Sequence, residues 1–321
     1  MIDPDAILAA IEELPPMQST DERDYLGASI LGEACQRKLW LQFHKYVEPE
    51  QFSSRMLRLL YRGQREEGMF EMYLRETGFT IIENCMSQTR WTDGFMSGAG
   101  DGVVEKNGER YCVEYKTHSL AQFKTLTRGE LIITHPKHFT QCQVNALKFN
   151  CVGAIYLAVN KDNDELFCDV IALDNEFANQ ELAKGEYVTM ADKAPDRIAS
   201  KPTSHLCKFC HAKNVCFGFD QPRINCRSCT SATKHRETGK FGCGKIEESG
   251  SIEQRSSNDH LPESGSCESH SWNPFFVQEF YGHSPIEFFP TERAVKYKRQ
   301  DGTEFINGAE PFGIPSKKLV L

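Results

Sequence analysis

A chain of 321 residues, 40% apolar and 26% charged, has the length and composition of a globular protein with one large domain or two unequal ones. No apolar run approaches the roughly 18 residues of a membrane span, and the acidic start MIDPDAILAAIEELPP lacks the basic region and apolar core of a signal peptide. The formal net charge of −8 excludes a general nucleic-acid coat protein, but not an enzyme whose cleft alone is basic.

The first half of the chain predicts helices followed by strands. After an acidic N-terminal helix, Ser29 is a candidate N-cap for a helix over residues 30–46, which contains Cys35. A second helix, over residues 55–78, is expected to end at Gly78, a candidate C′ glycine. Strands are then expected at residues 79–84, around 95–100 and at 111–117.

The second half predicts a helical region from about residue 120, interrupted at Pro136 and resuming at residue 138. Two strands, at residues 154–161 and 166–173, are joined by a turn at 162–164, and a helix follows at 175–193. This order of elements predicts an α/β (α+β) fold in which a mixed sheet is flanked by helices.

The composition changes near residue 220. Residues 226–270 are rich in Cys, Ser, Gly and charge, so they bury little apolar surface and either need a staple, such as a metal, or stay disordered. A hairpin is expected at residues 294–308, turning at Asp301 and Gly302. We therefore predict two parts, residues 1–220 and a cysteine-rich C-terminal module at 221–321.

The most informative pattern lies in GAGDGVVEKNGERYCVEYKT, residues 98–117. Asp101 stands in a short loop, and a turn at 106–109 folds the next strand back so that Asp101 can approach Glu114 and Lys116. These two alternate along a strand and therefore project from the same face. Two carboxylates suit Mg²⁺ or Mn²⁺, and the lysine can position or deprotonate a metal-bound water or neutralise a phosphate. The pattern indicates phosphodiester hydrolysis; a surface hairpin with solvated charges is the alternative.

With these motifs, residues 29–216 resemble the PD-(D/E)xK nuclease superfamily, and within it phage-type exonucleases of the RecB-like and lambda-exonuclease-like branch. Asp101, Glu114 and Lys116 match the D…ExK motif, and residues 63–67 resemble the helical G-x-x-x-(E/H) element. The resemblance implies a restriction-endonuclease-like sheet. It also implies a metal site on Asp101, Glu114, the main-chain carbonyl of Tyr115 and Glu67, with Glu66 as the alternative register.

Residues 138–141, His-Phe-Thr-Gln, resemble the later Y-x-x-Q element, with His138 where tyrosine is commoner. This implies a site role for Gln141 and a substrate-binding role for His138. His118 and Lys124 are candidates for phosphate contacts, although each is otherwise explained as a solvated surface residue.

The resemblance further implies an Mg²⁺- or Mn²⁺-dependent (exo)deoxyribonuclease that acts in DNA recombination or DNA degradation. DNA is then the expected partner, and a single-strand annealing protein is a candidate recombination partner. The resemblance is also compatible with an oligomer of this chain. We expect a cytoplasmic location, in the host cytoplasm if a phage encodes the chain, and no membrane association. Two alternatives stay open: a non-catalytic DNA-binding or scaffold protein on the same fold, and an RNA-directed nuclease.

Thirteen cysteines are many for a cytoplasmic protein, so clustered cysteines indicate metal ligands. A C-x2-C-x5-C pattern is formed by Cys207, Cys210 and Cys216. Iron–sulfur clusters usually need four thiolates, and the phrase ACQRKLW resembles that of the CRISPR-associated iron–sulfur nucleases. This implies Cys35 as the fourth ligand of a 4Fe–4S cluster. The alternatives are a zinc site in which His205 or His211 joins the three later cysteines, and free thiols without a metal.

A second group of metal-ligating residues fits a structural Zn²⁺ site: Cys226, Cys229, Cys243, Cys267 and His270. Cys267 is preferred to His270 as the fourth ligand because four thiolates are a common zinc set. The other cysteines lie in or beside apolar runs and are expected to be small buried hydrophobes: Cys85, Cys112, Cys142, Cys151 and Cys168.

Overall fold

The computed structural model describes residues 3–13, 22–87, 89–244, 270–282, 284–289 and 294–307. Its largest sheet has the strand order β2-β5-β6-β7-β8. The strands are β2 (Thr80–Glu83), β5 (Gly102–Lys106), β6 (Glu109–His118), β7 (Gly153–Asn160) and β8 (Leu166–Ala172). Only β6 and β7 run parallel, and the other neighbours are antiparallel. The predicted mixed sheet flanked by helices is therefore confirmed.

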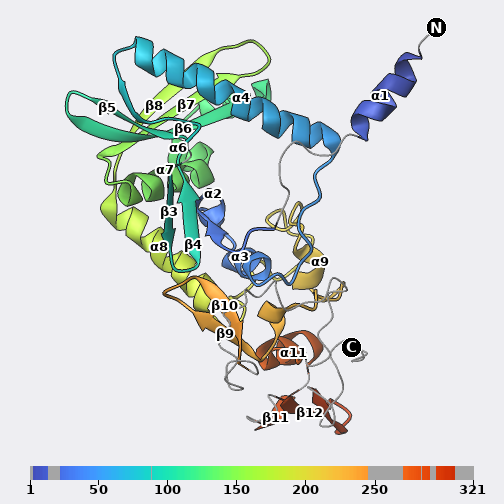
Figure 1. The fold of residues 1–321 in the computed structure, drawn as a ribbon. Coiled ribbons are helices and arrows are strands. Elements are labelled where there is room, and N and C mark those ends of the chain that lie inside the picture. The colour runs from blue at the N-terminus through green and yellow to red at the C-terminus, as the bar shows by residue number, and fades with distance from the viewer. Residues whose placement is uncertain are drawn as a thin grey trace.

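Helices cover both faces of this sheet (Figure 1). The long helix α4 (Ser54–Glu76) packs Phe70 and Leu74 on one face, against Val113 and Tyr115 of β6. The other face lies under α5 (Leu120–Leu126), α6 (Leu131–Thr134) and α7 (Pro136–Lys148). Residues of β6 alternate between the two faces, so Cys112 packs under α7 while Val113 packs under α4.

The β5–β6 connection is a two-residue turn. Asn107 and Gly108 both have positive φ, 55° and 81°, which matches the twist of the flanking strands. The register pairs Gly102 with Val113, so the start of β5 lies beside the middle of β6. The predicted turn at 106–109 is confirmed, and it brings the Asp101 loop to the strand that carries Glu114.

A smaller sheet has the order β1-β4-β3 and comprises β1 (Leu26–Gly27), β3 (Arg90–Asp93) and β4 (Met96–Ala99). It packs near α2 (Ala28–Leu31) and α8 (Asn175–Met190). The helix predicted over residues 55–78 is α4, and Gly78 follows it with φ +86°. Within the described residues, no helix has both the length and the apolar character that crossing a bilayer requires.

The single helix predicted over residues 30–46 is wrong. The chain forms α2 and then a separate α3 (Gln36–Phe43), and Gly27 rather than Ser29 is the N-cap residue of α2. Gly32 ends α2 where the chain meets α7: a Cβ there would lie 2.8 Å from the Cα of Lys137. Cys35 is consequently the N-cap residue of α3 and not an interior helical residue.

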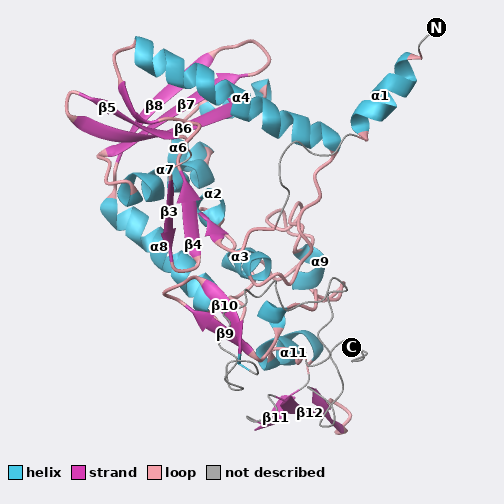
Figure 2. Ribbon diagram, in the orientation of Figure 1, coloured by secondary structure: helices cyan, strands magenta, loops and turns pink. Residues whose placement is uncertain are grey.

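The later elements are α9 (Lys213–Cys216), the 3₁₀ turn η1 (Cys226–Ser228), the hairpin β9 (Ala232–His235) and β10 (Lys240–Cys243), and α11 (Pro274–Tyr281). A last sheet joins β11 (Ser284–Phe289), β12 (Ala294–Lys298) and β13 (Glu304–Asn307), as Figure 2 shows in part. The hairpin predicted at residues 294–308 is confirmed by the β12–β13 pairing. Helix α1 (Pro4–Glu12) precedes all of these, and none of its residues is buried.

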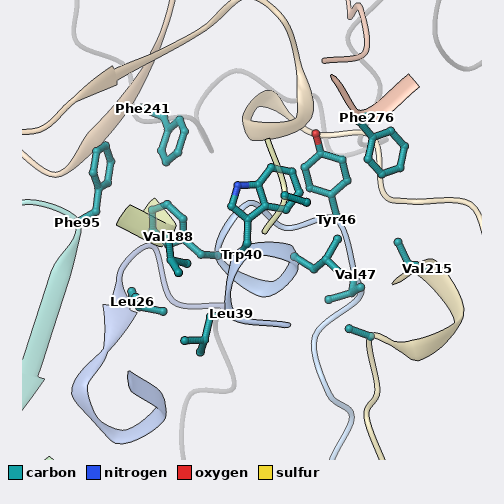
Figure 3. Close-up of a cluster of buried hydrophobic side chains, with 14 of the residues drawn as sticks. Leu26, Leu39, Trp40, Tyr46, Val47, Phe95, Val188, Val215, Phe241 and Phe276 are labelled. Atoms are coloured by element: carbon teal, nitrogen blue, oxygen red, sulfur yellow. The ribbon is translucent and has the colours of Figure 1, made fainter. Parts of the chain in front are cut away.

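One apolar cluster joins residues from both ends of the chain (Figure 3). Tyr46 lies 4.7 Å from Phe276, centroid to centroid, and Phe43 lies 5.7 Å from Phe241. The buried Arg227 guanidinium lies 4.9 Å from the Phe43 ring centroid and donates to the Phe43 carbonyl oxygen at 2.7 Å. The division at residues 220 and 221 stays a prediction, but the hydrophobic core continues across it.

Candidate active site

Asp101, Glu114 and Lys116 meet where β5 begins beside β6. The Asp101 Oδ2 atom accepts a hydrogen bond from the Tyr115 main-chain N–H at 2.7 Å. The Lys116 ammonium donates to Glu114 Oε1 and, at 3.2 Å, to the Tyr115 carbonyl oxygen. Alternation along β6 therefore brings the Glu114 and Lys116 side chains together, and the hairpin turn supplies the aspartate.

Glu114 has the most unusual environment of this group. Its side chain is 1% exposed, and its Oε2 atom has no hydrogen-bond partner within the described part of the chain. Burial raises the pKa of Glu114 to about 8; the Lys116 charge opposes this rise, and the Asp101 and Glu67 carboxylates add to it. Burial alone would lower the pKa of Lys116, but Glu114 and Asp101 outweigh it and raise that pKa.

Glu67 approaches the group from α4. Burial, the largest cause, and the Asp101 charge together raise the pKa of Glu67 to about 7, although the Lys116 charge opposes the rise. Glu66, one residue earlier, instead forms an ion pair with Arg62 at 3.7 Å along the helix. Glu67 thus lies in the field of Asp101 and Lys116, and Glu66 pairs with Arg62.

These residues suit a divalent cation by donor chemistry. Hard cations such as Mg²⁺ bind oxygen ligands, and a cation would compensate the unpaired Glu114 Oε2 atom and the repulsion that raises the carboxyl pKa values. Within the described ranges, no three His, Cys, Asp or Glu side chains already form a metal-binding group. In this structure, the Lys116 ammonium donates a hydrogen bond to the Oε1 atom of Glu114.

A group of histidines adjoins the carboxylates. The Tyr156 hydroxyl lies 2.9 Å from His118 Nε2 and 2.9 Å from His138 Nδ1, and Tyr156 is the register partner of Glu114 across β6 and β7. The His135 ring centroid lies 5.0 Å from that of His118 and 5.2 Å from that of His138. Burial, the largest cause, and nearby charges that include Lys116 together lower the pKa of His118 to about 4 and that of His138 to about 3.

Sequence reasoning missed two members of this group. His135 precedes His138 by three residues at the start of α7, a spacing that could have suggested a shared helix face. Tyr156 had no local signal, because its place depends on the register of β7 against β6. Gln141 is buried one turn after His138 on α7, whereas Lys124 is exposed on α5.

The first cysteine group converges on one cavity of about 350 Å³. Its lining includes Cys35, Cys207, Cys210 and Cys216, together with His205. Cys35 comes from the start of α3 and Cys216 from the end of α9, which lie beside each other in Figure 1. Burial raises the pKa of Cys207 and of Cys210, and the neighbouring cysteines add to both shifts. His211 lines a different pocket.

In the second cysteine group, the Cys229 Sγ atom accepts hydrogen bonds from the main-chain N–H groups of Ser231 at 3.4 Å and Ser271 at 3.5 Å. Burial raises the pKa of Cys229, the two N–H groups oppose the rise, and Cys243 adds to it. Cys226 begins η1, and His270 Nε2 lies 3.0 Å from the Ser228 hydroxyl. Cys267 lies outside the described residues.

Four of the cysteines expected to be buried hydrophobes are buried: Cys85, Cys112, Cys142 and Cys151. The expectation is wrong for Cys168, which is exposed. Cys168 lies on β8, the edge strand of the main sheet, where alternate residues point to solvent.

No protein-family model and no curated protein sequence matches the chain. Among solved structures, it is similar to an alkaline exonuclease (LHK-Exo) from Laribacter hongkongensis, with 16% identity over 52% of this chain and 87% of that one, at a TM-score of 0.38. The complex of LHK-Exo with dAMP matches at 16% identity over 51% and 86%, at a TM-score of 0.37. The structure of SSO0001 matches at 16% identity over 62% and 88%, at a TM-score of 0.36. Likeness this weak leaves the chemistry to be judged from the site itself.

Proposed function

We propose that the protein is a divalent-metal-dependent deoxyribonuclease of the exonuclease type. The observation that carries the proposal is the buried Glu114 carboxylate, which has one unpaired oxygen and lies beside Asp101, Glu67 and Lys116. The Oε1 atom pairs with the Lys116 ammonium, but a buried carboxylate oxygen that has no partner, as Oε2 has none, is still costly to keep. A protein that only bound DNA would gain nothing from this cost.

The proposed metal ligands are Asp101, Glu114, Glu67 and the carbonyl oxygen of Tyr115. A Mg²⁺ or Mn²⁺ ion bound there would lower the pKa of its water and stabilise the charge that builds on the phosphate. Asp101 also fixes the β6 main chain through the Tyr115 N–H. Lys116 holds its ammonium beside Glu114 and the Tyr115 carbonyl, where it orients the attacking water.

Neighbouring residues are proposed to hold the substrate. The Tyr156 hydroxyl fixes the rings of His118 and His138, whose lowered pKa values keep them neutral near pH 7. Neutral imidazoles can donate a hydrogen bond to a phosphate oxygen without competing for the metal charge. Gln141, one turn after His138, is proposed to support the same face of α7.

The biological setting that we propose is phage-type DNA recombination or DNA degradation, and it rests on the resemblance of the D…ExK, G-x-x-x-(E/H) and Y-x-x-Q elements. A single-strand annealing protein is a partner that fits this setting. A 4Fe–4S cluster at the first cysteine group and Zn²⁺ at the second are proposed as structural cofactors. Four thiols around one cavity support the first, and the N–H donors at Cys229 support the second.

We expect the full chain to release labelled nucleotides from end-labelled linear DNA with Mg²⁺ or Mn²⁺, and to release none after chelation by EDTA. Linear and circular DNA substrates compared side by side distinguish exonuclease from endonuclease action, and a labelled RNA of the same sequence tests the alternative substrate. Binding of DNA without cleavage in either metal would contradict the proposal and favour a non-catalytic binding protein.

Cys35→Ala is expected to lose both the bound metal and stability, because it removes one of the four proposed ligands, which line one cavity between α3 and α9. Anaerobically purified wild type should be brown and contain roughly four irons per chain, and the variant should be colourless with a lower Tm. Cys168→Ala, at an exposed cysteine, is the matched control. A colourless wild type that contains zinc but no iron would replace the cluster with a zinc site.

A further inference from the structure

Residues 197–219 differ in charge from the rest of the chain. They carry Arg197, Lys201, Lys208 and Lys213 and no aspartate or glutamate, in a protein whose formal net charge is −8. A local excess of one charge sets the field at a surface whatever the net charge of the molecule. This segment, which surrounds the first cysteine group, is therefore a locally basic surface.

An aromatic ring stands out from this surface. Phe209 is 89% exposed and Leu206 is 51% exposed. The Lys208 Nζ atom lies 5.2 Å from the centroid of the Phe209 ring. An exposed phenylalanine next to a lysine combines a flat apolar ring with a positive charge. This combination suits a partner that has both aromatic rings and a negatively charged backbone.

Carboxylates flank this segment at Asp196 and Asp220, and two others form ion pairs close to it. Glu33 is shared by Lys38 at 2.6 Å and Lys137 at 2.7 Å, both of which line the cysteine cavity. Glu279 is likewise shared by Arg37 at 2.5 Å and Arg197 at 3.7 Å. The Glu33 group therefore has two ammonium groups for one carboxylate and keeps a positive charge.

We propose that the surface formed by Leu206, Lys208, Phe209 and Lys213 binds single-stranded nucleic acid. Phe209 stacks on an unpaired base, and the two lysines contact the flanking phosphates. A duplex keeps its bases stacked inside and cannot offer them to the ring, so the surface favours single strands. This surface shares no residue with the carboxylate site. Helix α7 connects the two places, because its Lys137 lines the cysteine cavity and its His138 belongs to the histidine group.

Binding is measured by fluorescence anisotropy with a labelled oligothymidylate and the full chain, without added divalent metal and in a Lys116→Ala background. Cleavage is then absent, so the measured Kd reports binding alone. The result can be interpreted even if the protein proves not to be a nuclease. Phe209→Ala is expected to raise the Kd about tenfold, the loss of one stacked base. Tyr187→Ala, at an aromatic residue that is 54% exposed on α8, is the matched control and should bind as wild type.

Three further variants separate stacking from other causes. Phe209→Tyr keeps the ring and should keep the affinity, whereas Phe209→Leu keeps an apolar side chain without a stacking face and should bind as weakly as Phe209→Ala. Lys208→Gln should reduce the dependence of log Kd on log salt by about 0.7, one phosphate contact to a single strand. Metal content and Tm should match wild type in all four surface variants.

Wild-type affinity in Phe209→Ala or Phe209→Leu would overturn the proposal. Equal losses for the oligothymidylate and for a blunt duplex would also overturn it, because stacking requires an unpaired base. If Phe209→Ala changes only the sedimentation of the protein and leaves oligonucleotide binding intact, the surface contacts protein and the proposal is wrong.

Discussion

Lys116→Ala is expected to lower Mg²⁺-dependent cleavage of end-labelled DNA about a thousandfold, the range for loss of a group that acts on the nucleophile. The variant removes the ammonium that pairs with Glu114 and with the Tyr115 carbonyl oxygen. Affinity for DNA should change little, since one charge among many contacts is lost. Single-turnover rates, with DNA binding measured in parallel, separate the two effects.

Lys106→Ala is the control for this variant. Lys106 is also a lysine of the β5–β6 hairpin, but its ammonium donates to the Thr77 carbonyl oxygen at an exposed position, so cleavage should be unaffected. Glu67→Gln and Glu66→Gln form a second matched pair, in which only Glu67→Gln should lose activity deeply. Near-normal cleavage by Lys116→Ala would remove the central residue of the proposed site.

Local patterns were sufficient to predict that Asp101, Glu114 and Lys116 lie close together. The two-residue period of a strand put Glu114 and Lys116 on one face, and the Asn107-Gly108 turn returned the chain to Asp101. Both signals lie within a short stretch of sequence and depend on backbone sterics. The pairing of β6 with β7 could not be predicted in this way, because residues 119–152 separate the two strands and no local pattern sets their register. Tyr156 was missed for that reason.

Long-range packing also explains the other differences. Residues 30–46 have a helical pattern, but Gly32 meets α7 and the helix divides there. Residues 226–270 have a polar composition that suggests little core, yet Phe241 of this segment is buried against Phe43 and Phe95. A segment with few apolar residues can still be anchored when those residues pack on an apolar surface that another part of the chain forms. Composition averaged over the segment could not show this, because the receiving surface belongs to the N-terminal part.

Phe276→Ala is expected to destabilise the whole protein by about 3–5 kcal/mol, the usual cost of truncating a buried phenylalanine. Phe276 is 3% exposed and packs on Tyr46, 4.7 Å away between ring centroids, so the cavity would open in the cluster shared with Trp40. Phe275 precedes it on α11 but is 47% exposed, so Phe275→Ala should cost under about 0.5 kcal/mol.

Thermal unfolding followed by circular dichroism distinguishes a shared core from two separate ones. With a shared core, Phe276→Ala shifts one cooperative transition down by roughly 4–7 °C, and nuclease activity is lost over the same temperature range. The chain could then not be shortened near residue 222 without exposing Tyr46 and Trp40. With separate cores, Phe276→Ala would leave the melting of the nuclease part unchanged. The boundary near residue 220 would then divide two independent folding units rather than two segments of one.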